Sequence, residues 1–186
     1  MHAGTKLTLT HYTFSQLDEI WPTLIDVYAE VYAKEIAADP FFSVERFEDR
    51  LKNHTAAPNW EAVVGEVDGE IVGYAYGYAL RAGKSWWTAL RTPVADDSLT
   101  DETGSRTFGL AEIMVKAQWR GTGVARTIHD ELLSHRSEER AALLVERAHP
   151  RVRALYERWG YRWVGEILPF PDAPLYDAMV KPLREG

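Results

Sequence analysis

The chain has 186 residues, 46% of them hydrophobic, and a formal net charge of −7. This length fits one domain, so we expect a single domain over residues 1–186. Nucleic acid is not an expected partner, because a surface that binds phosphates makes a domain basic. The absence of cysteine excludes disulfides, thiolate metal ligands and a cysteine nucleophile.

Neither a membrane span nor a secretory signal is predicted. The longest uncharged apolar stretch, residues 71–80, has half the length that a membrane helix needs. Residues 1–6 contain a lysine with no apolar segment behind it. We therefore expect a soluble cytoplasmic protein with no membrane partner.

The first part of the chain predicts a strand, two helices and a hairpin. The strand covers residues 7–12, and apolar residues at three- and four-residue spacing then predict a helix over 17–32. Pro22 is expected to kink that helix or split it in two. A second helix is expected from Ser43 to about Asn53. Two apolar runs at 62–67 and 71–80, joined by Asp68-Gly69, then predict an antiparallel hairpin.

Residues 83–107 contain Gly83, Pro93, Gly104 and four acids. We interpret them mainly as a solvated acidic loop, with a functional segment or a hidden short strand as alternatives. The elements expected after this loop are strand 110–115, helix 123–135, strand 142–146, helix 150–159, strand 161–167 and strand 175–180. The whole order, β-α-α-β-β-β-α-β-α-β-β, predicts an α/β fold whose mixed, mostly antiparallel sheet contains one parallel βαβ unit and is flanked by helices.

The turn before helix 123–135 has the composition of an anion site. Between Glu112 and Asp130 there is no acid, although acids usually favour the start of a helix. The same stretch carries three cationic residues: Lys116, Arg120 and Arg126. Gly121 and Gly123 would let the backbone curl around a phosphate, and each amide hydrogen bond to it would contribute about 1.5–3 kcal/mol. The alternative is a tight turn without a ligand.

Two other nucleotide motifs fit this turn less well. A Walker loop needs Gly-Lys-Ser/Thr, whereas Val124 and Ala125 follow Gly123. A dinucleotide fingerprint is nearer, because Gly121-x-Gly123 opens a helix and Glu146 ends the next strand. However, Arg126 occupies its third glycine position and only one βαβ unit is expected. A dinucleotide-binding enzyme stays open as a weaker alternative.

The segment Arg120-x-x-Gly123-x-Ala125, five residues after Val115, resembles the acyl-coenzyme A signature of the GNAT superfamily of N-acetyltransferases. Residues 154–161 are similar to its second element, a short helix with a tyrosine ahead of an aromatic-led strand. The element order is also that of this family. The specific motifs lie within residues 110–161, and residues 1–60 match only in topology.

The resemblance implies direct transfer of an acetyl group from acetyl-CoA to a primary amine of a small molecule or peptide, without a metal. Strand residues Ile113, Met114 and Val115 would hydrogen-bond the pantetheine arm. Backbone amides near the start of the helix would hold the diphosphate, with Arg126 nearby; they belong to Arg120, Gly121, Thr122, Gly123, Val124 and Ala125. His149, where the family often has asparagine, and Arg153 complete the predicted cofactor contacts.

Tyr156 and Glu112 are the candidate catalytic residues. The resemblance implies that Tyr156 protonates the departing thiolate, since a phenol with a pKa of about 10 is protonated at neutral pH; packing on an apolar helix face is the alternative. Several relatives carry the base or acceptor contacts at positions matching Gly109 and Ala111, which cannot serve here. Glu112 is the nearby candidate base, and a salt bridge to Lys116 or an arginine is equally open. Weaker candidates for the base are Glu146 and Asp172.

The lost base positions leave a non-catalytic acyl-CoA-binding sensor as a rival function. If the chain is an enzyme, aromatic and acidic segments would build the acceptor site: Tyr28, Tyr32, Phe41, Phe42, residues 83–107 and residues 169–174. The histidines His54, His129 and His135 lack metal-ligand spacing and are expected at the surface, so no metal is predicted. A homodimer is left open.

Overall fold

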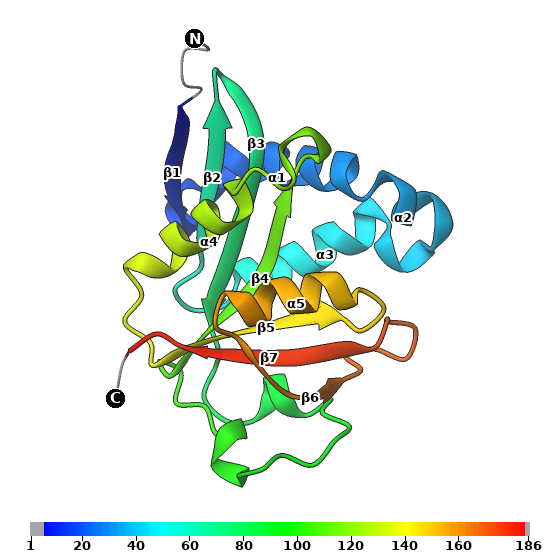
Figure 1. Ribbon diagram of the computed structural model, residues 1–186, viewed down its shortest axis with the longest axis vertical. Coiled ribbons are helices and arrows are strands. Elements are labelled where there is room, and N and C mark those ends of the chain that lie inside the picture. The colour runs from blue at the N-terminus through cyan, green and yellow to red at the C-terminus, as the bar shows by residue number, and fades with distance from the viewer. Residues whose placement is uncertain (1–5, 185–186) are drawn as a thin grey trace. The chain divides into compact units, whose positions relative to one another are not determined.

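The computed structural model describes residues 6–184, which form two compact units (Figure 1). The first unit runs up to Tyr78 and includes Ala111–His135. The second comprises Ala79–Leu110 and the chain from Arg136 on. Residues 1–5, on which the prediction about a secretory signal largely rests, lie outside the described part. The single domain over residues 1–186 stays a prediction.

Within residues 6–184, seven strands form one sheet, and β4 contributes to both units. The strands are β1 (Leu7–Thr13), β2 (Glu61–Val67), β3 (Glu70–Ala79), β4 (Thr107–Val115), β5 (Arg140–Glu146), β6 (Arg162–Ile167) and β7 (Tyr176–Pro182). Their order is β1-β2-β3-β4-β5-β7-β6. The pair β4–β5 is parallel, while β1–β2, β2–β3, β5–β7 and β6–β7 are antiparallel. The predicted α/β fold with a mixed sheet and one parallel βαβ unit is confirmed.

In the described part of the chain, five α-helices connect these strands: α1 (Leu17–Val31), α2 (Ala33–Ala38), α3 (Val44–Thr55), α4 (Val124–Ser134) and α5 (Pro150–Arg158). Helix α1 passes through Pro22 without a break, so the predicted split there is wrong. The break comes instead at Tyr32, where the backbone leaves helical geometry at φ −99° and ψ 17°. Within residues 6–184, no helix combines the length and the apolar character needed to cross a membrane.

In the first unit, helices cover both faces of the sheet. Because side chains alternate along a strand, Ala62 and Val64 of β2 pack with α1 and α3 in one core. The next residue, Gly65, faces α4, since a Cβ there would lie 2.9 Å from the Ile128 side chain. Figure 1 shows the same arrangement, with α4 in front of β1 and β2 and the helices α1 and α3 behind. The helix that begins at the glycine turn is therefore held against β2.

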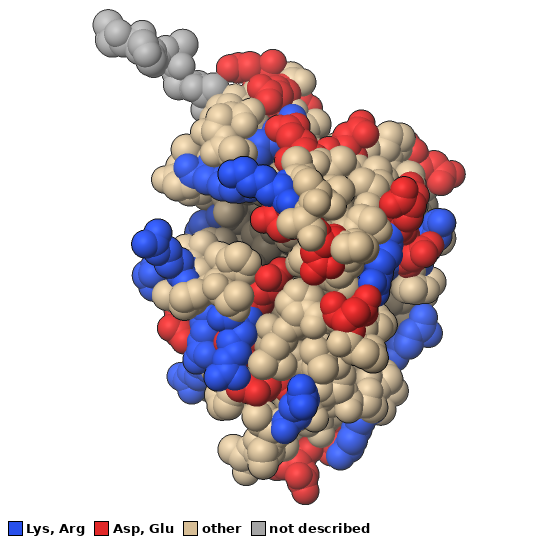
Figure 2. Space-filling view, turned by 90° about the vertical axis from the view of Figure 1, so that its right-hand side faces the viewer, with Lys and Arg blue, Asp and Glu red and all other residues tan. Residues whose placement is uncertain are grey.

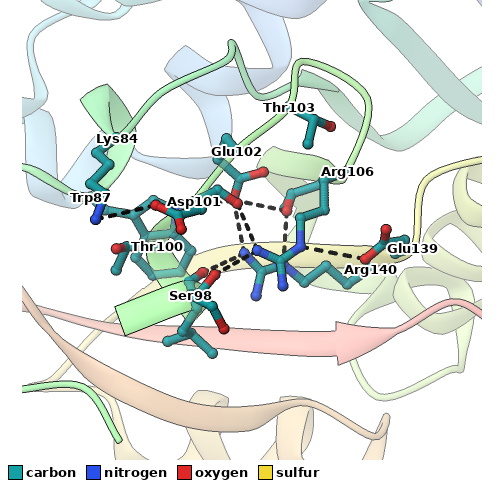
Figure 3. Close-up of polar contacts among 12 residues, drawn as sticks. Lys84, Trp87, Ser98, Thr100, Asp101, Glu102, Thr103, Arg106, Glu139 and Arg140 are labelled. Atoms are coloured by element: carbon teal, nitrogen blue, oxygen red, sulfur yellow. Dashed lines mark hydrogen bonds and ion pairs between the residues drawn. The ribbon is translucent and has the colours of Figure 1, made fainter. Parts of the chain in front are cut away.

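In the second unit, residues 83–107 are anchored by a buried ion pair. Glu102 is 7% exposed and Arg140 of β5 is 8% exposed, and the Arg140 Nη2 lies 2.8 Å from the Glu102 Oε1. The same carboxylate oxygen accepts hydrogen bonds from the Trp87 indole at 3.0 Å and the Thr107 hydroxyl at 2.9 Å (Figure 3). The interpretation of the segment as a solvated acidic loop is therefore wrong for Glu102.

The same segment also lies along β6. Leu90 forms an isolated β-bridge with Ile167, and the Arg91 amide donates to the Glu166 carbonyl at 2.7 Å. A Cβ at Gly165 would lie 2.6 Å from the Leu90 side chain, so glycine permits this close contact. The segment holds two short 3-10 helices, Ser85–Trp87 and Asp97–Thr100, and isolated bridges in place of the alternative hidden strand.

Candidate active site

The turn between β4 and α4 is built on two glycines in the left-handed region of backbone space. Gly121 has φ +75° and Gly123, the N-cap residue of α4, has φ +90°. Residues other than glycine rarely adopt such positive φ angles. A Cβ at either glycine would meet nothing within 4 Å among the described residues. The turn therefore has open space beside its backbone.

The start of α4 receives no hydrogen bond from a capping side chain within the described part of the chain, and its first turn holds no acid. Helix starts carry amide groups without intrahelical partners, together with the positive end of the helix dipole. The Thr122 hydroxyl donates to the Trp119 carbonyl at 2.6 Å, so it stabilises the turn and does not cap the helix. A phosphate group is the kind of ligand that this arrangement fits.

The three cations of the turn have partners of their own in the first unit. The Lys116 ammonium lies 3.1 Å from Glu30 and 3.6 Å from Glu70. The Arg120 Nε donates to the Val115 carbonyl at 3.2 Å, and the Arg126 Nε lies 2.5 Å from Asp130. Each of the three cations therefore has a partner within the first unit, and the partner of Arg126 lies on its own helix.

Glu112 lies on β4 near a group of buried tyrosines in the first unit. Burial raises the pKa of Tyr74 and Tyr76 well above 10, and the Glu112 charge raises both further. Lys116, one of the two salt-bridge partners considered for Glu112, contacts Glu30 and Glu70. Of the predicted pantetheine contacts on the same strand, Met114 and Val115 are buried and Ile113 is half-buried.

The second unit holds the other predicted site residues. Tyr156 on α5 is 8% exposed and packs edge-on against the rings of Trp159 and Tyr161. Arg153 is bound by two carboxylates, with Nη1 3.0 Å from Asp177 and Nε 3.1 Å from Glu157. The His149 Nε2 lies 3.1 Å from the Glu146 carboxylate. Tyr156 and Arg153 therefore lie on the same short helix, α5, which begins directly after His149.

Part of the predicted acceptor site is packed into the core. Tyr28 is 1% exposed and stacks on Phe47, and its hydroxyl donates to the Phe42 carbonyl at 2.9 Å. Phe41 and Phe42 are also buried. These three aromatic residues stabilise the helical layer, and only the half-buried Tyr32 of the four presents appreciable surface.

Two of the three histidines predicted at the surface, His129 and His54, are less exposed than expected. His129 is fully buried, with its Nδ1 2.8 Å from Asp130. His54 is half-buried, and its Nδ1 lies 3.1 Å from the Tyr76 hydroxyl. His135 is exposed as predicted, but it lies beside His11 and Glu131, a grouping that the sequence analysis missed. The four-residue spacing of Glu131 and His135 on one helix was the available signal, because such residues share a face.

The surface carries charges of both signs. On the face in Figure 2, lysine and arginine side chains occur together with aspartate and glutamate. The mixed charge agrees with the acidic net charge of −7.

The family model of the acetyltransferase (GNAT) family matches residues 21–161. This chain belongs to the GNAT family of acetyltransferases. The match spans the turn Gly121–Gly123 and Tyr156, so the resemblance predicted from those motifs is confirmed. The sheet also argues against the dinucleotide alternative, since a GNAT sheet with the parallel pair β4–β5 differs from the largely parallel sheet of dinucleotide-binding folds.

Solved structures with the same fold include other acetyltransferases. Aminoglycoside 6′-acetyltransferase type Ii gives a TM-score of 0.64 at 14% identity, covering 96% of this chain and 99% of its own. A chimeric spermidine N-acetyltransferase SpeG from Vibrio cholerae gives 0.61 at 15% identity, covering 96% of each chain. PaiA N-acetyltransferase from Thermoplasma acidophilum, in complex with coenzyme A, gives 0.58 at 11% identity, covering 95% and 99%. No curated protein matches this chain.

Proposed function

We propose that this GNAT chain transfers the acetyl group of acetyl-CoA to a primary amine of a small molecule or peptide. The observation that carries the proposal is the uncapped start of α4, where two left-handed glycines leave open space beside the backbone and the first turn holds no acid. Three fold neighbours support the substrate classes: one is an aminoglycoside acetyltransferase, one a spermidine acetyltransferase and one holds coenzyme A.

The amides near the start of α4, in the stretch 121–125, would bind the diphosphate of coenzyme A, whereas the Arg120 amide, also predicted as a donor, already donates to the Ala117 carbonyl at 3.3 Å. Hydrogen bonds to a charged acceptor contribute about 1.5–3 kcal/mol each, so several of them together would hold the diphosphate. Because Lys116 is held by Glu30 and Glu70, the backbone and the helix dipole would supply most of the attraction. The Arg126 guanidinium would also bind the phosphate, after breaking its ion pair with Asp130.

Acetyl-CoA supplies the acetyl group as a thioester. Glu112 would take a proton from the ammonium form of the acceptor, directly or through water, and free its lone pair to attack the thioester carbonyl. A backbone N–H of β4 would stabilise the oxyanion. As the carbon–sulfur bond breaks, the Tyr156 hydroxyl would protonate the leaving thiolate. The acetylated nitrogen would lose its second proton, which returns through water to the Tyr156 phenolate, and Glu112 would release the first proton to solvent. The products are an acetylated amine and coenzyme A.

The test has a binding arm and a turnover arm. Acetyl-CoA and coenzyme A should raise the melting temperature of the chain, whereas NAD(H) should not. An amine panel that includes spermidine and an aminoglycoside should release free thiol from acetyl-CoA. Tyr156→Phe should lower turnover about 100-fold with binding retained, and Tyr161→Phe, which removes a hydroxyl from the same aromatic cluster, should not.

Two results would contradict parts of this proposal. Turnover of Tyr156→Phe equal to that of the unaltered chain would remove Tyr156 as the proton donor. Coenzyme A binding without thiol release from any amine would favour the acyl-CoA-binding sensor over the enzyme.

A further inference from the structure

Three potential metal ligands meet in the first unit, away from the glycine turn. They are His11 on β1, Glu131 on α4 and His135, the C-cap residue of α4. One ligand atom from each lies within 4.8 Å of the others. The closest pair is the His11 Nε2 and the Glu131 Oε1 at 2.8 Å, and the two imidazole centroids are 5.8 Å apart.

A fourth residue orients the first ligand. The His11 Nδ1 lies 2.6 Å from the Glu61 carboxylate of β2, so Nδ1–H donates to Glu61 and Nε2 points at Glu131. Metal-binding histidines almost always have such a carboxylate or carbonyl on their second nitrogen, which fixes the tautomer and makes the ligand more basic. The cluster therefore has the outer partner of a metal site as well as the ligands.

The spacing of the ligands fits a small ion after minor adjustment. Tetrahedral zinc with bonds of about 2.0–2.1 Å places its ligand atoms about 3.4 Å apart and two bound imidazole centroids about 5 Å apart. The His11–Glu131 pair must open by about 0.5 Å. His135 is exposed and its side chain can turn inward. Two imidazoles and one carboxylate are also a ligand set that zinc accepts with an open fourth position.

The place on α4 favours a cation. Partial negative charge gathers at the C-terminal end of a helix, which stabilises positive charge there. Helix α4 has 11 residues and is about 16 Å long, so this cluster and the glycine turn lie at opposite ends of it. An ion here would tie edge strand β1 to α4 and would be too distant to act on a ligand at the turn.

We propose that His11, Glu131 and His135 bind one zinc ion at the C-terminal end of α4, with water as the fourth ligand. Zinc replaces the proton on the His11 Nε2, which leaves to solvent. The sequence analysis expected no metal because His54, His129 and His135 lack metal-ligand spacing; His11 is 120 residues from Glu131, and only the fold brings these two residues together. An ion here would stabilise the contact between β1 and α4, and its binding does not depend on the acetyl-transfer proposal.

The test uses the full chain without an affinity tag, stripped with chelator and titrated with zinc by calorimetry. We expect one equivalent to bind and the melting temperature to rise. His135→Ala changes an exposed residue, so it should fold normally and bind zinc at least about tenfold more weakly, and Glu61→Gln should weaken binding about 10–100-fold through its effect on His11. The matched control is His149→Ala, which removes an exposed imidazole 3.1 Å from Glu146 that has no place in the cluster.

Cobalt offers an independent readout, since Co²⁺ in a tetrahedral site has an intense visible spectrum that a loosely bound ion lacks. The proposal predicts this spectrum for the unaltered chain and for His149→Ala, and its loss in His135→Ala. It is overturned if the unaltered chain binds no stoichiometric zinc, or if His135→Ala binds zinc as tightly as the unaltered chain.

Discussion

Helices α3 and α4 belong to the same unit and are nearly equal in length, but they begin in opposite ways. At α3 the Ser43 hydroxyl accepts from the Arg46 amide at 3.4 Å, and Glu45 adds a negative charge in the first turn. At α4 the N-cap is Gly123, no described side chain caps it, and the second helical residue is Ala125 where α3 has Glu45. At α3 the chain's own side chains supply the hydrogen bond and the negative charge that a helix start favours. At α4 the described side chains supply neither, so an external anion could bind there.

The sharpest test of this contrast exchanges the second residue of each helix. Ala125→Glu should stabilise the chain by about 0.3–1 kcal/mol through the helix dipole, yet weaken coenzyme A binding about 100-fold by repelling the diphosphate. Glu45→Ala should lose a similar amount of stability and leave binding unchanged. Urea unfolding and calorimetry with coenzyme A measure the two effects. Unchanged binding in Ala125→Glu would contradict an anion site at α4.

The C-terminal end of α3 provides a pH test. Burial, reinforced by the Arg50 charge, lowers the pKa of His54 in its last turn to about 4. The unfolded chain protonates this histidine below about pH 6.5, so stability should fall by about 3 kcal/mol between pH 6.5 and 4 and level off below that. His54→Gln should remove this part of the pH dependence, as measured by urea unfolding at several pH values. An unaltered slope would show that His54 is protonated in the folded chain.

Two glycines with positive φ, one at the start of α4 and one in a turn between strands, give a third comparison. Gly123→Ala forces a Cβ onto φ +90° and should distort the turn, reducing coenzyme A affinity about tenfold. Gly69→Ala is the control, because Gly69 has φ +84° and equally open space in the β2–β3 turn. Both changes should cost about 1–2 kcal/mol in unfolding experiments. Equal loss of affinity in both variants would mean that strain alone, and not the turn, governs binding.

The smallest expected effect concerns the capped helix. Ser43→Ala removes the hydroxyl that accepts from the Arg46 amide and should destabilise the chain by about 1 kcal/mol. Coenzyme A affinity should not change. A measurable loss of coenzyme A affinity would show that the starts of α3 and α4 are energetically coupled, and would contradict their independence.

The fold was largely predictable from periodicity and turn residues. Two apolar runs joined by the Asp68-Gly69 pair predicted the hairpin, and the order of the elements predicted the parallel pair β4–β5. These signals are local, so a single sequence carries them. The roles of Glu112 and Tyr156 in catalysis stay predictions.

What the sequence did not reveal depends on contacts between distant residues. Glu102 looked like one more solvated acid, because its partner Arg140 lies 38 residues further along. His129 looked like a surface residue, although packing against β2 puts it on the inner side of α4 with Ile128. Whether such a polar residue is buried depends on the partners that the fold brings to it, and its residue type alone does not indicate burial.

The ion pair between Glu102 and Arg140 limits how this protein can be altered. Loop exchange is a common way to graft new specificity onto a scaffold, and residues 83–106 look suited to it because they are rich in turn residues. Excising them would leave the buried Arg140 guanidinium, at the start of β5, without its carboxylate, at a loss of about 3–5 kcal/mol. Any graft at this position must therefore bring an acid of its own or replace Arg140 with an apolar residue.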